Sequence, residues 1–78
     1  MSAYGVALFN TTTSVMRAEK LLQKAGITVK LIPTPRQFSS DCGIAVRFDA
    51  KDLERARGVF AQARLEPAAI HEMQAHVA

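Results

Sequence analysis

The chain has 78 residues, 49% of them apolar and 22% charged, and its ten basic and seven acidic side chains leave a formal charge of +3. This length and composition indicate one globular domain over residues 1–78, with a frayed tail at about 74–78, and exclude a disordered chain. The apolar runs are far shorter than the roughly 20 residues of a bilayer-spanning helix, and the start shows no signal-peptide pattern, so we expect neither membrane insertion nor secretion.

The first half of the chain predicts a strand, a helix and a second strand. Residues 4–9 form a short apolar run that is typical of a central strand. Several N-cap residues follow, and apolar positions then recur at helical spacing, so we predict a helix over residues 13–25 that ends at Gly26. Residues 27–32 are predicted to form a second strand, which Pro33 ends because proline has no N–H to donate.

The second half predicts a loop, a strand, a helix and a last strand. Residues 33–42 are expected to form a loop or a single helical turn, and residues 43–48 alternate as a third strand does. Asp49 is a candidate N-cap for the second helix. The apolar stripe of that helix consists of Leu53, Ala56, Phe60 and Ala63. A turn at Glu66-Pro67 precedes a fourth strand over residues 68–73.

The resulting order, βαββαβ, predicts the fold class. In fewer than 80 residues it favours an α+β, ferredoxin-like two-layer sandwich, with two helices on one face of an antiparallel sheet of order 4-1-3-2. Small apolar residues on the other, uncovered face would make it a candidate homodimer interface. We expect that face to carry Gly5, Ala7, Thr28, Ile32 and Ala45, interrupted by Lys30 and Arg47.

Cys42 is the only cysteine in the chain. A disulfide within the chain and a cysteine-rich zinc site are therefore excluded, and we expect the reducing cytoplasm as the location. The predicted topology brings the N-terminus of the first helix to the same end of the sheet as the loop that holds Cys42. Free backbone N–H groups at that terminus, with hydroxyl donors and Arg36, would lower the pKa of the thiol, whereas Asp41 would raise it.

The candidate site therefore has Cys42 as its reactive group, and no metal or other cofactor is expected. Glycine after the cysteine leaves room for a partner to approach, and the neighbouring serines offer hydrogen bonds. The residues expected to bind the anion or shape this approach are Thr11, Thr12, Thr13, Ser14, Arg36, Ser39, Ser40 and Gly43. The alternative is that Cys42 is an apolar filler of the core, but its polar loop context argues against a position within a buried stripe.

Several stretches of the chain resemble one known family. They include Leu31-Ile32-Pro33-Thr34-Pro35-Arg36 and, most specifically, Ser39-Ser40-Asp41-Cys42-Gly43-Ile44-Ala45. Over about residues 4–65 the sequence resembles the selenium/sulfur carrier-like family of small bacterial domains. The resemblance implies that Cys42 carries sulfur or selenium as a persulfide or selenosulfide, and that other proteins act as donor and acceptor. It implies a carrier rather than an enzyme with its own turnover.

Other functions find less support in the sequence. His71 and His76 are five residues apart, whereas helical zinc ligation needs a spacing of four. A hydrolase that pairs Cys42 with His71 would lack an identifiable group to orient the histidine. RNA recognition on such a sheet needs stacking aromatics where Gly43 and Ala45 stand, and the basic residues form no block, so we expect no nucleic-acid partner. A dimeric interaction or ligand-sensing module, in which Cys42 is incidental, is the remaining alternative.

Overall fold

A computed structural model describes residues 3–35, 37–38 and 43–74 of the chain. Its elements follow the predicted order, with one additional 3-10 turn before the second helix. They are β1 (Ala3–Leu8), α1 (Thr12–Lys24), β2 (Val29–Pro33), β3 (Ile44–Asp49), η1 (Ala50–Asp52), α2 (Leu53–Gln62) and β4 (Ala69–Gln74). None of the described helices is long and apolar enough to span a bilayer.

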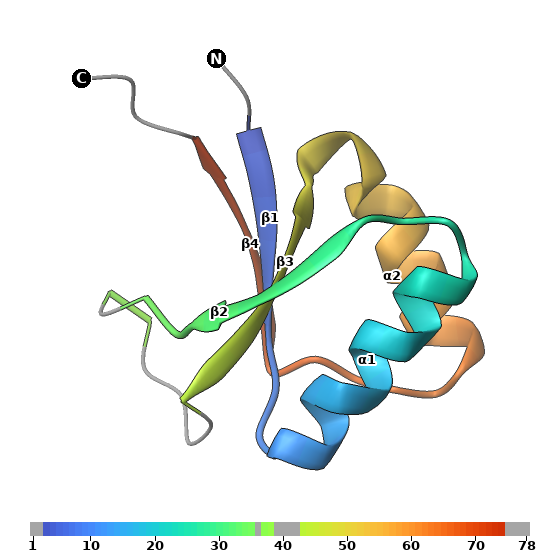
Figure 1. Cartoon of the computed structure of the whole chain (residues 1–78), viewed down its shortest axis with the longest axis horizontal. Helices are drawn as coiled ribbons and strands as arrows, with labels where there is room; N and C mark the ends of the chain where they lie inside the picture. Colours follow the sequence, from blue (N-terminus) through green and yellow to red (C-terminus); the bar gives the residue numbers. More distant parts are fainter. Residues whose placement is uncertain (1–2, 36, 39–42, 75–78) are drawn as a thin grey trace.

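The four strands form one antiparallel sheet of order β2-β3-β1-β4. Counted from the β4 edge, this order is the predicted 4-1-3-2. Figure 1 shows both helices on the same side of the sheet. The α+β class and the strand order are thus confirmed.

The element boundaries differ from the predictions by a few residues, each for a local reason. α1 begins one residue early because Thr11 caps it, and β2 begins only at Val29 because Ile27 completes the end of α1. Pro33 belongs to β2, opposite Ile44, which an edge strand tolerates since its missing N–H is not needed by a neighbour. Gln74 still pairs within β4, so the predicted fraying does not begin there, and residues 75–78 lie outside the described part.

The side chains of β1 point to the opposite faces of the sheet from those predicted. Ala7 packs in the core beneath the helices, and Gly5 lies opposite Phe48 in the same layer. A Cβ at Gly5 would stand 2.6 Å from a carbon of the Phe48 ring, so only glycine leaves room for that ring. Val6 and Leu8 consequently occupy the other face of the strand. The placement of Gly5 and Ala7 on the uncovered face was therefore wrong.

The face away from the helices is also buried at its centre. Val6 and Ala45 have no exposed surface, and Leu8 is buried beside them. Half-buried side chains pack around this second cluster, namely Tyr4, Ile32, Phe38, Ala69 and Met73. The apolar centre of this face, which was predicted to be a candidate homodimer interface, is therefore covered by other side chains of the same chain.

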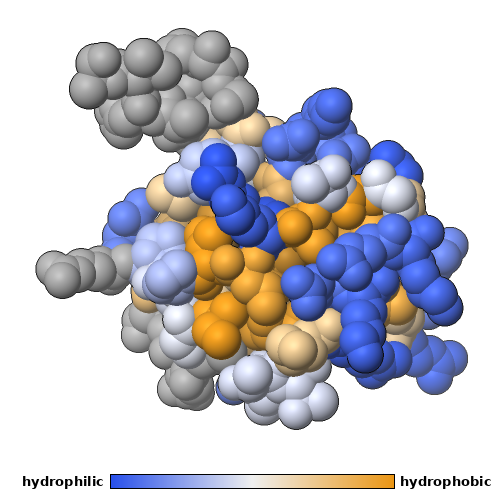
Figure 2. All heavy atoms as spheres, viewed as in Figure 1, coloured by the Kyte–Doolittle hydropathy of each residue, from blue (hydrophilic) through white to orange (hydrophobic). Residues whose placement is uncertain are grey.

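The first and larger core lies between the sheet and the helices. Phe9 and Phe60 meet edge to face there, with ring centroids 5.5 Å apart, among the buried side chains of both helices. Figure 2, seen from the side of β2, shows apolar residues gathered in the middle of the view, where the sheet meets α1. Hydrophilic side chains gather over the helices on the right of the same view.

The C-cap carbonyl of each helix accepts a hydrogen bond from an arginine of the other helix. Arg17 of α1 donates to the carbonyl of Ala63, the C-cap of α2, at 3.2 Å, and Arg55 of α2 donates to the carbonyl of Ala25, the C-cap of α1. These bonds satisfy carbonyls that a helix C-terminus leaves without a partner, and they place a cation at the negative end of each helix dipole. The pair of bonds holds the antiparallel helices in a fixed alignment.

We predict that Arg17→Met and Arg55→Met each lower the free energy of unfolding by about 1 kcal/mol, because each removes a charged hydrogen bond at a helix end. Urea denaturation followed by circular dichroism measures the loss. Lys20→Met is the matched control, since it removes an exposed cation of α1, and it should change stability by less than about 0.5 kcal/mol. Equal losses in all three variants would show that general charge, and not the two caps, is responsible.

Candidate functional site

The N-terminus of α1 is capped by hydroxyl groups and carries no carboxylate. Thr11 has the extended backbone of an N-cap, and its Oγ1 accepts a hydrogen bond from the Ser14 N–H at 3.1 Å. The same hydroxyl donates to the Ser14 Oγ at 3.0 Å. Thr12 and Thr13 are exposed in the first turn, which contains no acidic residue. The partial positive charge of this terminus is therefore not neutralised by the helix itself.

The loop between β2 and β3 is closed at its base. The Thr34 N–H donates to the Gly43 carbonyl at 3.0 Å, one residue beyond the last strand pair. Next to it, the Phe38 N–H donates to the Pro35 carbonyl at 3.0 Å, which closes a four-residue turn. This turn falls in the segment for which a loop or a single helical turn was predicted.

The base of this loop and the start of α1 lie at one end of the sheet. Continuing the antiparallel register of β1 and β3 past Ala7 and Val46 brings Asn10 level with Gly43. In Figure 1 the start of α1 and the start of β3 are both at the bottom of the molecule. The topology therefore places Gly43 at the same end of the sheet as the N-terminus of α1. We call residues 11–14, the cap and first turn of α1, the helix entrance.

Phe38 anchors the described half of the loop to the face away from the helices. Its ring stacks on His71 of β4, with centroids 3.9 Å apart and an angle of 4° between the rings. Beneath the pair lie the buried side chains of Val6, Leu8 and Ala45. Sequence reasoning missed this contact, because Phe38 and His71 stand in two segments whose approach only the folded sheet creates.

The other sequence-based site residues divide into two groups. Thr11, Thr12, Thr13 and Ser14 form the first turn of α1 and its cap, and Gly43 is exposed at the base of the loop. Cys42 lies outside the described residues, as do the three expected to surround it in sequence, Arg36, Ser39 and Ser40. The roles of these four residues in binding and transfer thus stay predictions.

The alternative sites can be compared with the described residues. His71 faces Phe38, and His76 lies outside the described part. Where an RNA-binding sheet would need a stacking ring, Ala45 is fully buried and carries only a methyl group. Within residues 3–35, 37–38 and 43–74, no group of three or more histidine, cysteine, aspartate or glutamate side chains is placed to hold a metal ion.

The comparison with known families agrees with the resemblance of the central motif. The model of the family described as "Putative Se/S carrier protein-like" matches residues 4–72. The chain belongs to this Se/S carrier protein-like family. The match extends from β1 into β4 and so includes His71, beyond the part of the sequence in which we recognised the resemblance. No curated protein matches the chain.

We predict that Phe38→Ala lowers the free energy of unfolding by about 2 kcal/mol, because it removes a half-buried ring and uncovers the buried cluster beneath it. Phe38→Leu keeps part of the apolar cover and should lose about half as much. Denaturation in urea measures both variants. A loss below about 0.5 kcal/mol for Phe38→Ala would mean that the ring does not hold the loop to the sheet.

Proposed function

We propose that this Se/S carrier-like protein receives a sulfane sulfur or selenium atom on Cys42 and passes it to an acceptor protein. The observation that carries the proposal is the family match over residues 4–72, in a chain that offers one cysteine only. A lone thiol suits a carrier, because no second cysteine can displace the bound atom by forming a disulfide. We further propose that the protein acts in the cytoplasm, where this thiol stays reduced, and that its fold is ferredoxin-like.

The transfer needs no added oxidant when the donor is itself a persulfide. The Cys42 thiolate attacks the outer sulfur of a donor R–S–SH, the new S–S bond forms on Cys42, and R–S⁻ leaves with the electron pair of the broken S–S bond. The proton on the outer sulfur stays with it. A donor R–S–SeH reacts in the same way and leaves a selenosulfide on Cys42.

The helix entrance supports this chemistry. Thiolate is the reactive form of cysteine, and a helix N-terminus favours a nearby anion. The first turn of α1 has hydroxyl groups and no carboxylate, and it shares one end of the sheet with Gly43, the residue bonded to Cys42. We propose that this entrance, with Arg36, Ser39 and Ser40, stabilises the anion during transfer.

We predict that the Cys42 thiol has a pKa below the ordinary value of about 8.5. The rate of alkylation by iodoacetamide should therefore rise with pH and level off at a lower pH than it does for free cysteine. After incubation with a glutathione persulfide donor, intact mass spectrometry should show a gain of about 32 Da, and a selenium donor should add about 79 Da. Cys42→Ser should abolish both gains while changing stability by less than about 1 kcal/mol.

Two results would contradict the carrier function. One is an alkylation pKa at or above about 8.5 together with no mass gain from either donor. The other is a loss of several kcal/mol in the Cys42→Ser variant, which is the cost expected of a packed core side chain. The second result would favour an interaction module in which the cysteine is incidental.

We predict that Thr11→Asp raises the pKa of Cys42 and slows its alkylation at neutral pH, because a carboxylate at the helix entrance repels a thiolate. Aspartate is at least as good an N-cap as threonine, so the variant should keep its stability within about 0.5 kcal/mol. Thr11→Asn is the matched control, since it caps the helix without a charge. If both variants react at the same rate as the parent chain, the helix entrance does not act on the thiol.

A further inference from the structure

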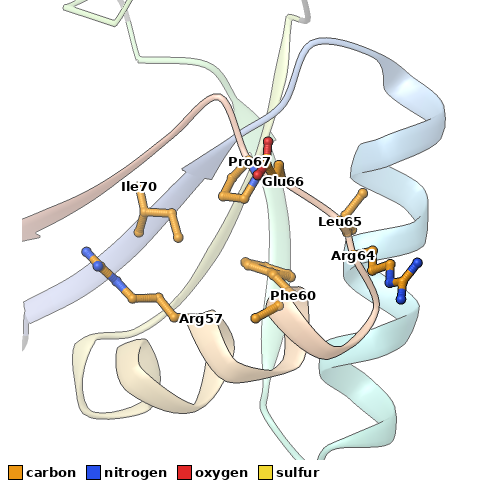
Figure 3. A pocket seen from close by; sticks show the side chains of 8 residues that line it. Arg57, Phe60, Arg64, Leu65, Glu66, Pro67 and Ile70 are labelled. Carbon is orange, nitrogen blue, oxygen red and sulfur yellow. The ribbon is translucent and has the colours of Figure 1, made fainter.

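A cavity of about 650 Å³ lies between α2, the connection after it, and β4. Half-buried Pro67 and Ile70 line it, above the buried side chains of Phe60 and Leu65. Figure 3 shows Phe60 in the centre, with Arg57 and Arg64 on opposite sides of it. This hollow is open to solvent, has an apolar floor and carries charged groups at its rim, and its volume lies in the range of ligand-binding clefts.

The two arginines at the rim of the cavity, Arg57 and Arg64, have no polar partner within the described part of the chain. Both are exposed, and neither guanidinium makes an ion pair or hydrogen bond with a described residue, unlike Arg17 and Arg55, which are bound to the helix ends. The rim also carries one acidic residue, Glu66, so its formal charge is two minus one, or +1. The charge of the rim therefore favours an anionic occupant.

The backbone at Arg64 gives an independent reason to assign this arginine a role. Both helices end in the same way: the residue two past the C-cap donates to the third carbonyl from the end, Ile27 to Leu22 in α1 and Leu65 to Phe60 in α2. The residue between must adopt a positive φ, and in α1 this is Gly26, at φ 80°.

In α2 the same position is held by Arg64, at φ 56°. A side chain in this left-handed conformation is unfavourable, and glycine would avoid the cost. One chain thus uses glycine and arginine in the same structural motif, and the arginine is the one that lines a cavity. Residues held in sparsely populated backbone conformations cluster at functional sites, so this position is a candidate for one.

We propose that this cavity binds an acidic, extended segment of a partner protein. Figure 3 shows the side chains of Arg57 and Arg64 on opposite sides of the hollow, so an occupant that meets both must cross it. Two carboxylates three residues apart in an extended chain are about 10 Å apart, which lets them flank the hollow. An aliphatic side chain between them would enter the hollow over Pro67 and Ile70. The proposal does not depend on a reactive Cys42, although the cavity and Gly43 lie at the same end of the sheet.

The test is an NMR titration of the ¹⁵N-labelled full chain with a capped peptide that carries two glutamates three positions apart and a leucine between them. We expect shift changes confined to α2, the connection after it and the start of β4. Replacing both glutamates of the peptide by glutamine should weaken binding about tenfold. Equal binding of the two peptides, or shift changes on the other face of the sheet, would overturn the proposal.

A charge series in the protein separates binding from folding. Arg64→Gly should raise the thermal midpoint, because it relieves the backbone, and yet weaken peptide binding about threefold. Arg64→Lys keeps the charge and should bind within about twofold of the parent chain, Arg57→Gln should bind about threefold more weakly, and Glu66→Gln about twofold more tightly. An Arg64→Gly variant that binds the peptide as well as the parent chain would overturn the proposal.

Two further controls distinguish the occupant and the thiol. Lys51→Gln removes an exposed cation outside the cavity and Cys42→Ser removes the thiol, and both should bind the peptide within about 1.5-fold of the parent chain.

Vesicles of phosphatidylcholine with phosphatidylserine, and a single-stranded RNA, test the other polyanions that two arginines attract. If either binds in an Arg64-dependent way while the peptide does not, the assignment of a protein partner is wrong.

Discussion

The structure depends on covering both faces of the central strand pair. In β1 and β3 successive side chains point to opposite faces, and both faces carry apolar residues without exposed surface: Ala7 and Val46 on one, Val6 and Ala45 on the other. Two helices cover the first face. Neither helix of the described part lies on the second face, which is covered by the ring of Phe38 and by side chains of the strands themselves.

This requirement links the β2–β3 loop to the sheet. A loop that served only to connect two strands could be two residues long, whereas this one contributes an aromatic ring to the second cluster. The stack of Phe38 on His71 ties the loop to the far strand β4, across the width of the sheet. The described residues on either side of residues 39–42 are thus held in place, Phe38 by its stack on His71 and Gly43 by the hydrogen bond from the Thr34 N–H.

The two halves of the molecule repeat one strand–helix–strand plan with one informative difference. Each helix ends in the same capping motif, and each C-cap carbonyl accepts a hydrogen bond from an arginine of the opposite helix. The difference is the residue with positive φ, which is Gly26 in one half and Arg64 in the other. Because the backbone geometry is shared, the capping motif favours glycine at both positions. Arg64 instead places a charged side chain at the rim of the α2–β4 cavity, at the same end of the sheet as the helix entrance of α1.

The sequence alone predicts the element order, the helix stripes and the lone thiol, because these depend on local periodicity and composition. It also identified the N-cap run before α1, since hydroxyl side chains cap helices through contacts only three residues away. It misassigned the face of Gly5, because alternation shows which residues share a face but not which face the helices will cover. Three features arise only when the chain folds: the stack of Phe38 on His71, the exchange of arginines between helix ends and the cavity beside Arg64. The stack and the exchange of arginines join segments distant in the chain, and the cavity depends on how α2 and β4 pack against each other.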